Sequence, residues 1–206
     1  MLFRSSDVSY IETKEGFVYL LIIICLLSRK VVGFHVSDHQ REESLLSAMQ
    51  QALYGHRNPV LFHSDRGGIY GAKRFKAVLR RHRIRQSMSR AGNCHDNALT
   101  ESFFATLKCE EAHHVYETKR EAIQSITDYI VNFYNPIRLH SGIEYQTPEA
   151  MNKALKLGAL STYPQPTKSP TRGAARTRPR KEGSCGYVGN RSRNVPNNVA
   201  QHQNLR

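Results

Sequence analysis

The run FVYLLIIICLL, residues 17–27, is apolar without a break. Residues 17–25 of this run are dense in β-branched and aromatic residues, which is typical of a strand that is buried on both faces in the middle of an α/β sheet. Eleven residues are too few for a membrane span, which needs about 20 residues. Acidic residues precede the run and no small-residue cleavage site follows it, which argues against a signal peptide. We therefore expect a central strand, no membrane partner and a reducing, cytoplasmic location.

The segments around this strand alternate between strand-like and helix-like patterns. Apolar residues at helical spacing predict helices at residues 42–54, 73–82, 98–108 and 119–134. Further strands are expected at residues 9–13, 31–37, 59–65 and 84–89, the last of them at an edge of the sheet. This order joins an antiparallel start to βα units. It predicts an α/β fold with a mixed five-stranded sheet flanked by helices.

Charge divides the chain into two parts. The 206 residues carry a formal net charge of +13 and a pI of about 9.9. Residues 1–153 hold 20 Lys and Arg against 16 Asp and Glu, whereas residues 154–206 hold 10 against 1. The second part has no apolar periodicity, which predicts a disordered basic tail after a core domain of residues 1–153. Such an excess of positive charge favours a polyanionic partner, nucleic acid before an anionic membrane surface.

The four cysteines do not form a C-x-x-C pair. That spacing argues against a ribbon-type zinc site and against a secreted disulfide framework. A zinc site built from Cys94, Cys109, His113 and His114 would fit no strong ligand pattern.

Three carboxylates stand where a metal site would need them. Asp7 opens the first strand, Asp65 closes the strand at residues 59–65, and Glu101 lies on the helix at residues 98–108. Strand ends of an α/β sheet meet at one edge, where polar clefts form. Carboxylate oxygens there suit Mg²⁺ or Mn²⁺. Spacing alone leaves solvated surface charge as the alternative, since any chain of this length offers three carboxylates.

Three longer motifs carry a resemblance to a known family. HSDRGGIY, SMSRAGNCHDNALTESFFATLK and FYNPIRLHSGIEYQTPEA resemble the catalytic core of bacterial insertion-sequence transposases of the OrfB type. These belong to the retroviral-integrase-like DDE superfamily, and the resemblance covers about residues 5–153. It implies an RNase H-like fold and metal-dependent DNA cleavage and strand transfer. On this resemblance Asp7, Asp65 and Glu101 fall on the three catalytic acids, and Lys108 falls on the basic residue seven positions after the glutamate.

The same resemblance implies the cofactors and partners. They are two Mg²⁺ or Mn²⁺ ions held by the three acids, DNA as transposon ends and target, and further copies of the chain in an active homo-oligomer. Because seven residues are close to two helical turns, Glu101 and Lys108 share a helix face. A cation there would hold a DNA phosphate beside the metals, and the alternative is a surface lysine with no special role.

Other basic side chains are candidates for DNA contact. Residues 73–90 hold eight Lys and Arg and no acid, which indicates either a strip that binds phosphates or a solvated face. For the basic residues of the YNPIRLHSG segment, a structural loop packed on the core is the equal alternative. The candidate DNA-binding residues are Lys108, Lys73, Arg74, Arg80, Arg81, Arg138 and His140.

A few polar residues near the acids have a less specific interpretation. His63 either lines the site or is a packed histidine. Asn93 and Asn97 are expected first to shape the start of the following helix, with Asp96 or Asn97 as its N-cap, and only second to touch DNA.

The chain also departs from the family pattern. It begins six residues before Asp7, without the upstream helix-turn-helix segments, and Cys25 stands where the family has an aspartate. The residues after about 153 resemble nothing in the family. These departures predict a truncated or decayed copy. The alternatives to a transposase core are a non-catalytic nucleic-acid binder, an RNase H-like nuclease that does not join strands, and a fragment that does not fold.

Overall fold

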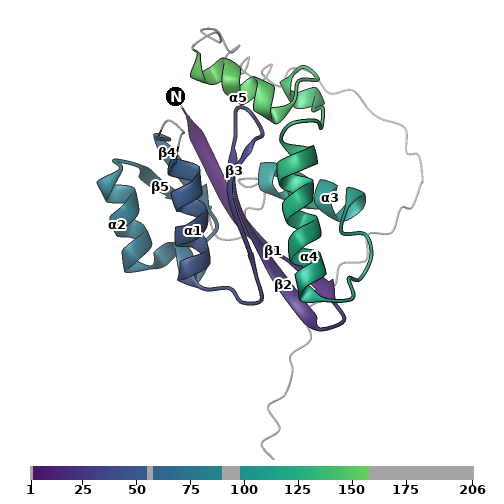
Figure 1. The fold of residues 1–206 in the computed structure, drawn as a ribbon. Helices are drawn as coiled ribbons and strands as arrows, with labels where there is room; N and C mark the ends of the chain where they lie inside the picture. Colours follow the sequence, from purple (N-terminus) through teal and green to yellow (C-terminus); the bar gives the residue numbers. More distant parts are fainter. Residues whose placement is uncertain (1, 55–57, 90–97, 158–206) are drawn as a thin grey trace, which may run out of the picture. The chain divides into compact units, whose positions relative to one another are not determined.

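The computed structural model of the chain describes residues 2–54, 58–89 and 98–157. The strands in these ranges are β1 (Phe3–Thr13), β2 (Gly16–Cys25), β3 (Val31–Ser37), β4 (Leu61–Ser64) and β5 (Arg85–Met88). They form one five-stranded sheet in the order β3-β2-β1-β4-β5 (Figure 1). β1, β2 and β3 pair antiparallel, whereas β4 is parallel to β1 and to β5. The expected mixed sheet is therefore confirmed, with β5 at its edge.

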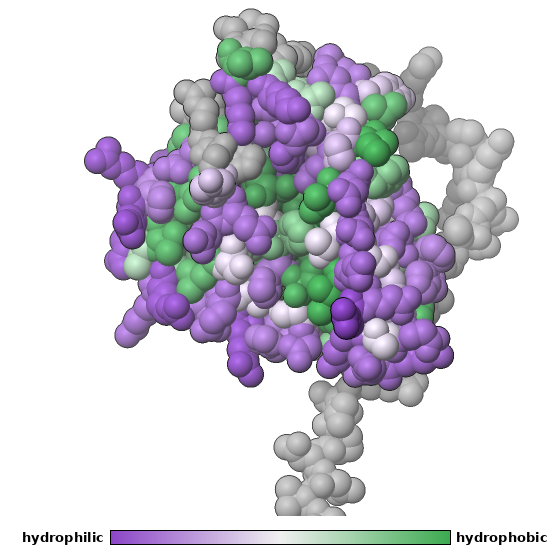
Figure 2. Space-filling view, viewed as in Figure 1, coloured by the Kyte–Doolittle hydropathy of each residue, from purple (hydrophilic) through white to green (hydrophobic). Residues whose placement is uncertain are grey.

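Helices cover both faces of the sheet. α1 (Glu42–Leu53) and α2 (Lys73–Arg81) pack on one face, and α3 (Ala98–Glu110) and α4 (Lys119–Asp128) pack on the other (Figure 1). Hydrophilic residues cover most of the surface in the view of Figure 2, as expected for amphipathic helices on a sheet. No helix in the described ranges is long and apolar enough to cross a bilayer.

β2 contributes side chains to the hydrophobic core on both faces of the sheet. Its residues from Leu20 to Cys25 are each at most 3% exposed, so the strand is buried on both faces, as the apolar run predicts. Leu20, Ile22 and Ile24 belong to the core that contains α3 and α4. The residues between them belong to the core under α1 and α2. Side chains of neighbouring strands can therefore be assigned to a face from their pairing with β2.

β1 is longer than the sequence predicts. The expected strand begins at residue 9, but the ladder with β2 already begins at Arg4 and includes Asp7. The short polar residues before Asp7 are buried because β1 lies between two strands here. The Ser6 hydroxyl, for example, donates a hydrogen bond of 2.7 Å to the carbonyl oxygen of Ile22. Pairing on both sides thus extends a strand whose sequence has no apolar lead-in.

The helix expected at residues 119–134 is present, but its last six residues have π-helical geometry. α4 ends at Asp128 and continues as a π-helix, η3 (Tyr129–Tyr134). A 3₁₀ turn, η4 (Ser141–Ile143), and a further helix, α5 (Pro148–Lys156), follow. The sequence does carry the signal for α5, because the Thr147 side chain accepts a hydrogen bond from the N–H of Ala150 and a proline occupies the first turn.

Gly33 brings β3 and α1 into close approach. A Cβ atom at this position would lie 2.1 Å from the backbone oxygen of Ala48 and 3.1 Å from the Cβ of Ala52. The pairing of β2 with β3 also shifts register between Ile23 and Ile24, next to this glycine. α1 can therefore rest directly on the backbone of β3.

Cys25 offers a test of charge in the core. It lies opposite Arg4 in the β1–β2 ladder, and both residues are buried. Burial lowers the pKa of Arg4 to about 10, and Cys25 partly offsets that effect, so the guanidinium is charged at pH 7. We expect Cys25→Asp to be more stable than Cys25→Asn by about 1–2 kcal/mol, because only the carboxylate attracts that buried charge. Urea unfolding at pH 7 compares the two variants, and an Asn variant as stable as the Asp variant would contradict this prediction.

Candidate active site

Two of the three predicted acids meet through the parallel pairing of β1 with β4. In this ladder Ser5 pairs with His63 and Ser6 pairs with Ser64. The next residue in each segment is an aspartate: Asp7 continues β1 and Asp65 directly follows the end of β4, so the two stand at the same level of the sheet. Both line one cavity of about 110 Å³. Its other lining residues are Val8, Ser9, Tyr10, Tyr19, Gln40 and Tyr70.

Local hydrogen bonds orient the two carboxylates. Asp7 Oδ1 accepts a bond of 2.8 Å from the N–H of Val8. Asp65 Oδ1 accepts a bond of 2.9 Å from the N–H of Gly67, which closes an Asx turn. A Cβ at position 67 would lie 3.0 Å from that same oxygen, so glycine keeps the turn tight. Asp65 is exposed and Asp7 is partly buried.

Tyr70 forms the buried wall of this cavity. It belongs to the 3₁₀ turn η1 (Gly68–Gly71), and its hydroxyl lies 3.0 Å from the hydroxyl of Ser6. Burial raises its pKa above the ordinary value, and the negative charges of Asp7 and Asp65 raise it further. Tyr70 therefore keeps its proton, close to both carboxylates. Sequence reasoning missed this residue, although it follows Asp65 by only five positions in HSDRGGIY.

Glu101 is not among the residues that line the cavity. It is exposed in the first turn of α3, and residues 90–97 before it are outside the described ranges. Within those ranges no three His, Cys, Asp or Glu side chains gather as metal ligands would. α3 does lie on the right face, because Asp7 pairs with Ile22, whose side chain belongs to the core of α3. The convergence of Glu101 with the two aspartates stays a prediction.

Lys108, on α3, contacts a residue that lines the cavity. Its ammonium lies 5.3 Å from the centroid of the Tyr10 ring, which is a cavity wall. This cation–π contact places the positive charge over a residue that lines the same cavity as the two aspartates. Lys108 and Glu101 are both exposed and lie two turns apart on α3.

The basic strip of the sequence lies largely on α2. Lys73, Arg74, Arg80 and Arg81 are all exposed on this helix. Arg74 forms a solvent-exposed ion pair with Glu43, with 3.2 Å between Nη1 and Oε1. Such a pair contributes little to stability, so its charge remains available to an anionic partner. Contact between α2 and DNA stays a prediction.

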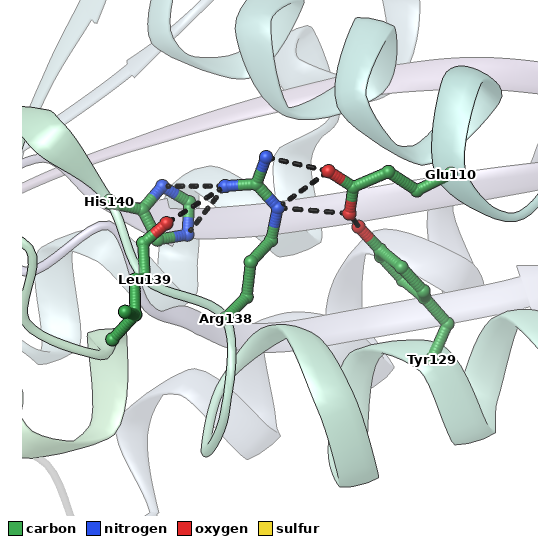
Figure 3. A network of polar contacts seen from close by, with 5 residues as sticks. All are labelled: Glu110, Tyr129, Arg138, Leu139 and His140. Carbon is green, nitrogen blue, oxygen red and sulfur yellow. Dashed lines mark hydrogen bonds and ion pairs between the residues drawn. The ribbon is translucent and has the colours of Figure 1, made fainter.

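Arg138 and His140 are partly buried and have partners within the chain (Figure 3). Nε and Nη2 of Arg138 donate to the carboxylate of Glu110 at 2.6–2.9 Å. The ring of His140 lies 5.0 Å from the ring of Tyr134. These contacts agree with the alternative of a loop packed on the core, while DNA contact by the two residues stays a prediction.

His140 makes stability depend on pH. Burial, and after it the charge of Arg138, lowers its pKa from 6.5 to about 4. The fold thus favours the neutral ring, and this contribution is fully present above about pH 6.5 and is lost as the pH falls toward 4. We expect His140→Gln to reduce the loss of stability between pH 7 and pH 5. Urea midpoints at the two pH values measure it, and an equal loss in both proteins would refute the role of His140.

His63 lies between two hydroxyl groups. Its Nδ1 is 3.1 Å from Ser87 Oγ and its Nε2 is 3.0 Å from Ser89 Oγ. It does not line the cavity, which agrees with a packed histidine. Other sequence candidates lie outside the described residues: Cys94, Asn93, Asp96, Asn97, Arg90 and nearly all of the basic tail.

Sequence families identify this core. Two models of the integrase core domain match the chain, one over residues 4–94 and the other over residues 82–148. Together they span both aspartates, Glu101 and the segment that contains Arg138.

Full-length relatives agree with this match. The transposase for insertion sequence element IS904 of Lactococcus lactis subsp. lactis is 40% identical over 153 residues, which are 71% of this chain and 59% of the relative. The transposase InsF for insertion sequence IS3A of Escherichia coli K12 is 39% identical over 148 residues, 70% of this chain and 51% of the relative. The chain thus spans between half and three fifths of the length of these relatives.

Solved structures share the fold at low sequence identity. The catalytic core domain of HTLV-2 integrase, solved in complex with magnesium, matches with a TM-score of 0.51 and 14% identity over 73% of this chain and 95% of that one. The catalytic core domain of BIV integrase matches with a TM-score of 0.53 and 14% identity over 76% of this chain and 97% of that one. The RNase H-like fold is therefore confirmed, and the chain belongs, over residues 4–148, to the integrase core domain family.

Proposed function

We propose that residues 1–153 are the catalytic core of a transposase, which cuts DNA and joins the cut strand to a target. The observation that carries the proposal is the meeting of Asp7, on β1, and Asp65, directly after β4, in one cavity. Tyr10, which also lines this cavity, contacts Lys108. The reaction is an attack on a DNA phosphodiester, first by water and then by a DNA 3′-hydroxyl. The partners are transposon ends, target DNA and further copies of the chain. The place of action is the cytoplasm.

The side chains of the cavity fit a divalent metal. Two carboxylates supply the oxygen ligands that Mg²⁺ and Mn²⁺ prefer, and each is held by a backbone N–H. Asp7 and Asp65 would hold the ions, with Glu101 completing the set from α3. When bound, two such ions supply a lowered pKa of the attacking group and stabilisation of the charged transition state.

The remaining side chains position the DNA. Lys108 holds a phosphate beside the acids, and the exposed cations of α2 bind phosphates farther along the duplex. Tyr70 keeps its proton and forms a buried part of the cavity lining next to the two acids. Each of these residues binds or orients, and none has to exchange a proton.

Calorimetric titration of Mn²⁺ into the full chain tests the proposal. The variants are Asp65→Asn and Glu101→Gln, and Asp128→Asn on α4 is the matched control. We expect both site variants to weaken binding at least tenfold and the control to bind like the wild type. Binding that ignores Asp65 would refute the proposal, and binding that ignores only Glu101 would remove that residue from the site.

The exposed basic row of α2 favours a second candidate, a DNA-binding protein that does not cut. This candidate predicts salt-dependent binding of duplex DNA that is the same with and without Mn²⁺.

A plain nuclease is distinguished from a transposase by its reaction products. Labelled strands joined to a target plasmid identify a transposase, whereas cut strands alone identify a nuclease.

A further inference from the structure

The last turn of α3 is held by a compact ionic contact, here named the Glu110 clamp (Glu110, Tyr129 and Arg138). The carboxylate of Glu110 accepts from Nε and Nη2 of Arg138 and, at 2.7 Å, from the hydroxyl of Tyr129 (Figure 3). The side chains of Glu110 and Arg138 are 32% and 24% exposed. A bidentate, half-buried pair of this kind fixes geometry more strictly than a single surface ion pair.

The clamp joins α3 to the segment that follows α4. Tyr129 opens η3, and the backbone N–H of Arg138 donates to the carbonyl oxygen of Phe133 in η3. A second contact lies farther along the same helix: the Phe103 ring of α3 is 4.8 Å from the ring of Tyr134, also in η3. α3 is therefore held at two points that lie seven residues apart, about 10 Å along its axis.

Both points lie on one face of α3, and the predicted site residues lie on the other. Phe103, Leu107 and Glu110 have the spacing of a single helix face, and the first two are at most 2% exposed. Glu101 precedes Glu110 by nine residues, about two and a half turns, so its side chain leaves the opposite face. Lys108 shares the face of Glu101. Rotation of α3 about its axis would move both residues relative to Asp7 and Asp65.

We propose that the Glu110 clamp is a positioning device that sets the rotation of α3 and so directs Glu101 and Lys108 toward the two aspartates. This inference rests on the function proposed above. It makes Arg138 a positioning residue that touches neither metal nor DNA and acts through Glu101. It also assigns a structural role to Arg138 of the YNPIRLHSG segment, which is to fix the orientation of α3 from the face opposite Glu101.

A double-mutant cycle on Mn²⁺ affinity tests the inference in the full chain. The proteins are the wild type, Glu101→Gln, Arg138→Ala and the double variant, each titrated with Mn²⁺ alone. We expect each single variant to bind about tenfold more weakly and the double variant to bind no more than twofold more weakly than Glu101→Gln. Effects that multiply to about a hundredfold would overturn the inference, because Arg138 would then act independently of Glu101.

Lys30→Ala separates positioning from general stability. Lys30 and Glu149 form an ion pair with side chains 16% and 30% exposed, and neither residue lies on α3. We expect Lys30→Ala to lower the melting temperature about as much as Arg138→Ala while keeping the Mn²⁺ affinity within twofold of the wild type. An equal loss of affinity in Lys30→Ala would overturn the inference.

Two milder variants keep the test decisive if Arg138→Ala does not fold. Arg138→Lys keeps the charge but not the bidentate contact, and we expect it to recover at least half of the lost affinity on a logarithmic scale. Tyr129→Phe removes one hydroxyl from the clamp, and we expect about threefold weaker binding of Mn²⁺. Wild-type affinity in Tyr129→Phe, or no recovery in Arg138→Lys, would overturn the inference.

Two further measurements distinguish the remaining explanations. If Arg138→Ala lowers the salt dependence of duplex binding by about one phosphate contact, Arg138 binds DNA and the inference is wrong. Asp65→Asn, titrated in parallel, reports on the proposed function itself. If Asp65→Asn binds Mn²⁺ like the wild type, the proposed function fails and the inference fails with it. If Asp65→Asn loses Mn²⁺ but Arg138→Ala does not, only the inference fails.

Discussion

Asp65→Asn is expected to slow metal-dependent DNA cleavage by about a hundredfold to a thousandfold while the protein stays folded. The loss is large because the carboxylate would hold a metal ion in the transition state, and one such stabilising group is commonly worth a factor of 10²–10³. The fold survives because the amide oxygen of asparagine can still accept the N–H of Gly67, the contact that Asp65 makes in its turn. Nicking of supercoiled plasmid in Mn²⁺ measures the rate.

The control for this variant is Asp128→Asn. Asp128 is an exposed aspartate at the end of α4, away from the cavity that Asp65 lines. We expect its nicking rate to stay within twofold of the wild type. Melting curves of both variants should match that of the wild type within a few degrees. Nicking by Asp65→Asn at the wild-type rate would mean that Asp65 takes no part in the reaction.

Gly33→Ala is expected to be the most damaging small substitution in the fold. The added Cβ would lie 2.1 Å from a backbone oxygen of α1, so no change of rotamer can relieve the overlap. Either α1 or β3 must move, and every residue of their shared core moves with it. We expect a loss of about 3–5 kcal/mol in the free energy of unfolding, which corresponds to a fall of about 10 °C or more in melting temperature.

Gly71→Ala is the matched control for Gly33→Ala. It adds the same methyl group at a glycine that has no atom within 4 Å of the added Cβ and no positive φ. We expect a change of at most about 0.5 kcal/mol. Differential scanning calorimetry compares the three proteins. A Gly33→Ala protein that melts with the wild type would show that α1 has room to move away from β3.

The sequence predicts this fold well where burial is continuous. β2 and β3 match their expected bounds within one residue, because an apolar run bounded by polar residues leaves little choice of ends. The sequence predicts β1 too short because Arg4, Ser5 and Ser6 look like loop residues, and only pairing with two strands buries them. Local patterns cannot reveal such burial, since it depends on which strands become neighbours.

The sequence predicts the two aspartates that line the cavity, but not the side chains that surround them, and the place of Glu101 stays a prediction. Asp65 stands at the end of a buried strand, where a motif marks it, and the family resemblance adds Asp7. The Glu110 clamp joins residues 28 positions apart, and in the sequence its glutamate and arginine look like any other surface charges. Tyr70 is likewise positioned by a contact between its hydroxyl and that of Ser6, which is distant in the sequence. Non-local partners of this kind are visible only once the helices are packed.

The parallel ladder between β1 and β4 has a consequence for how such chains can change in length. Asp7 and Asp65 are 58 positions apart in the sequence, yet four residue pairs set their separation in space. Closing a longer connection costs little entropy, about 0.6 kcal/mol for each doubling. Insertions in the loops between the two acids should therefore be tolerated. A slip of one residue in the ladder would instead turn Asp65 to the opposite face of the sheet. The number of residues between the two acids can therefore change during evolution, whereas the register of the four β1–β4 pairs has to be conserved.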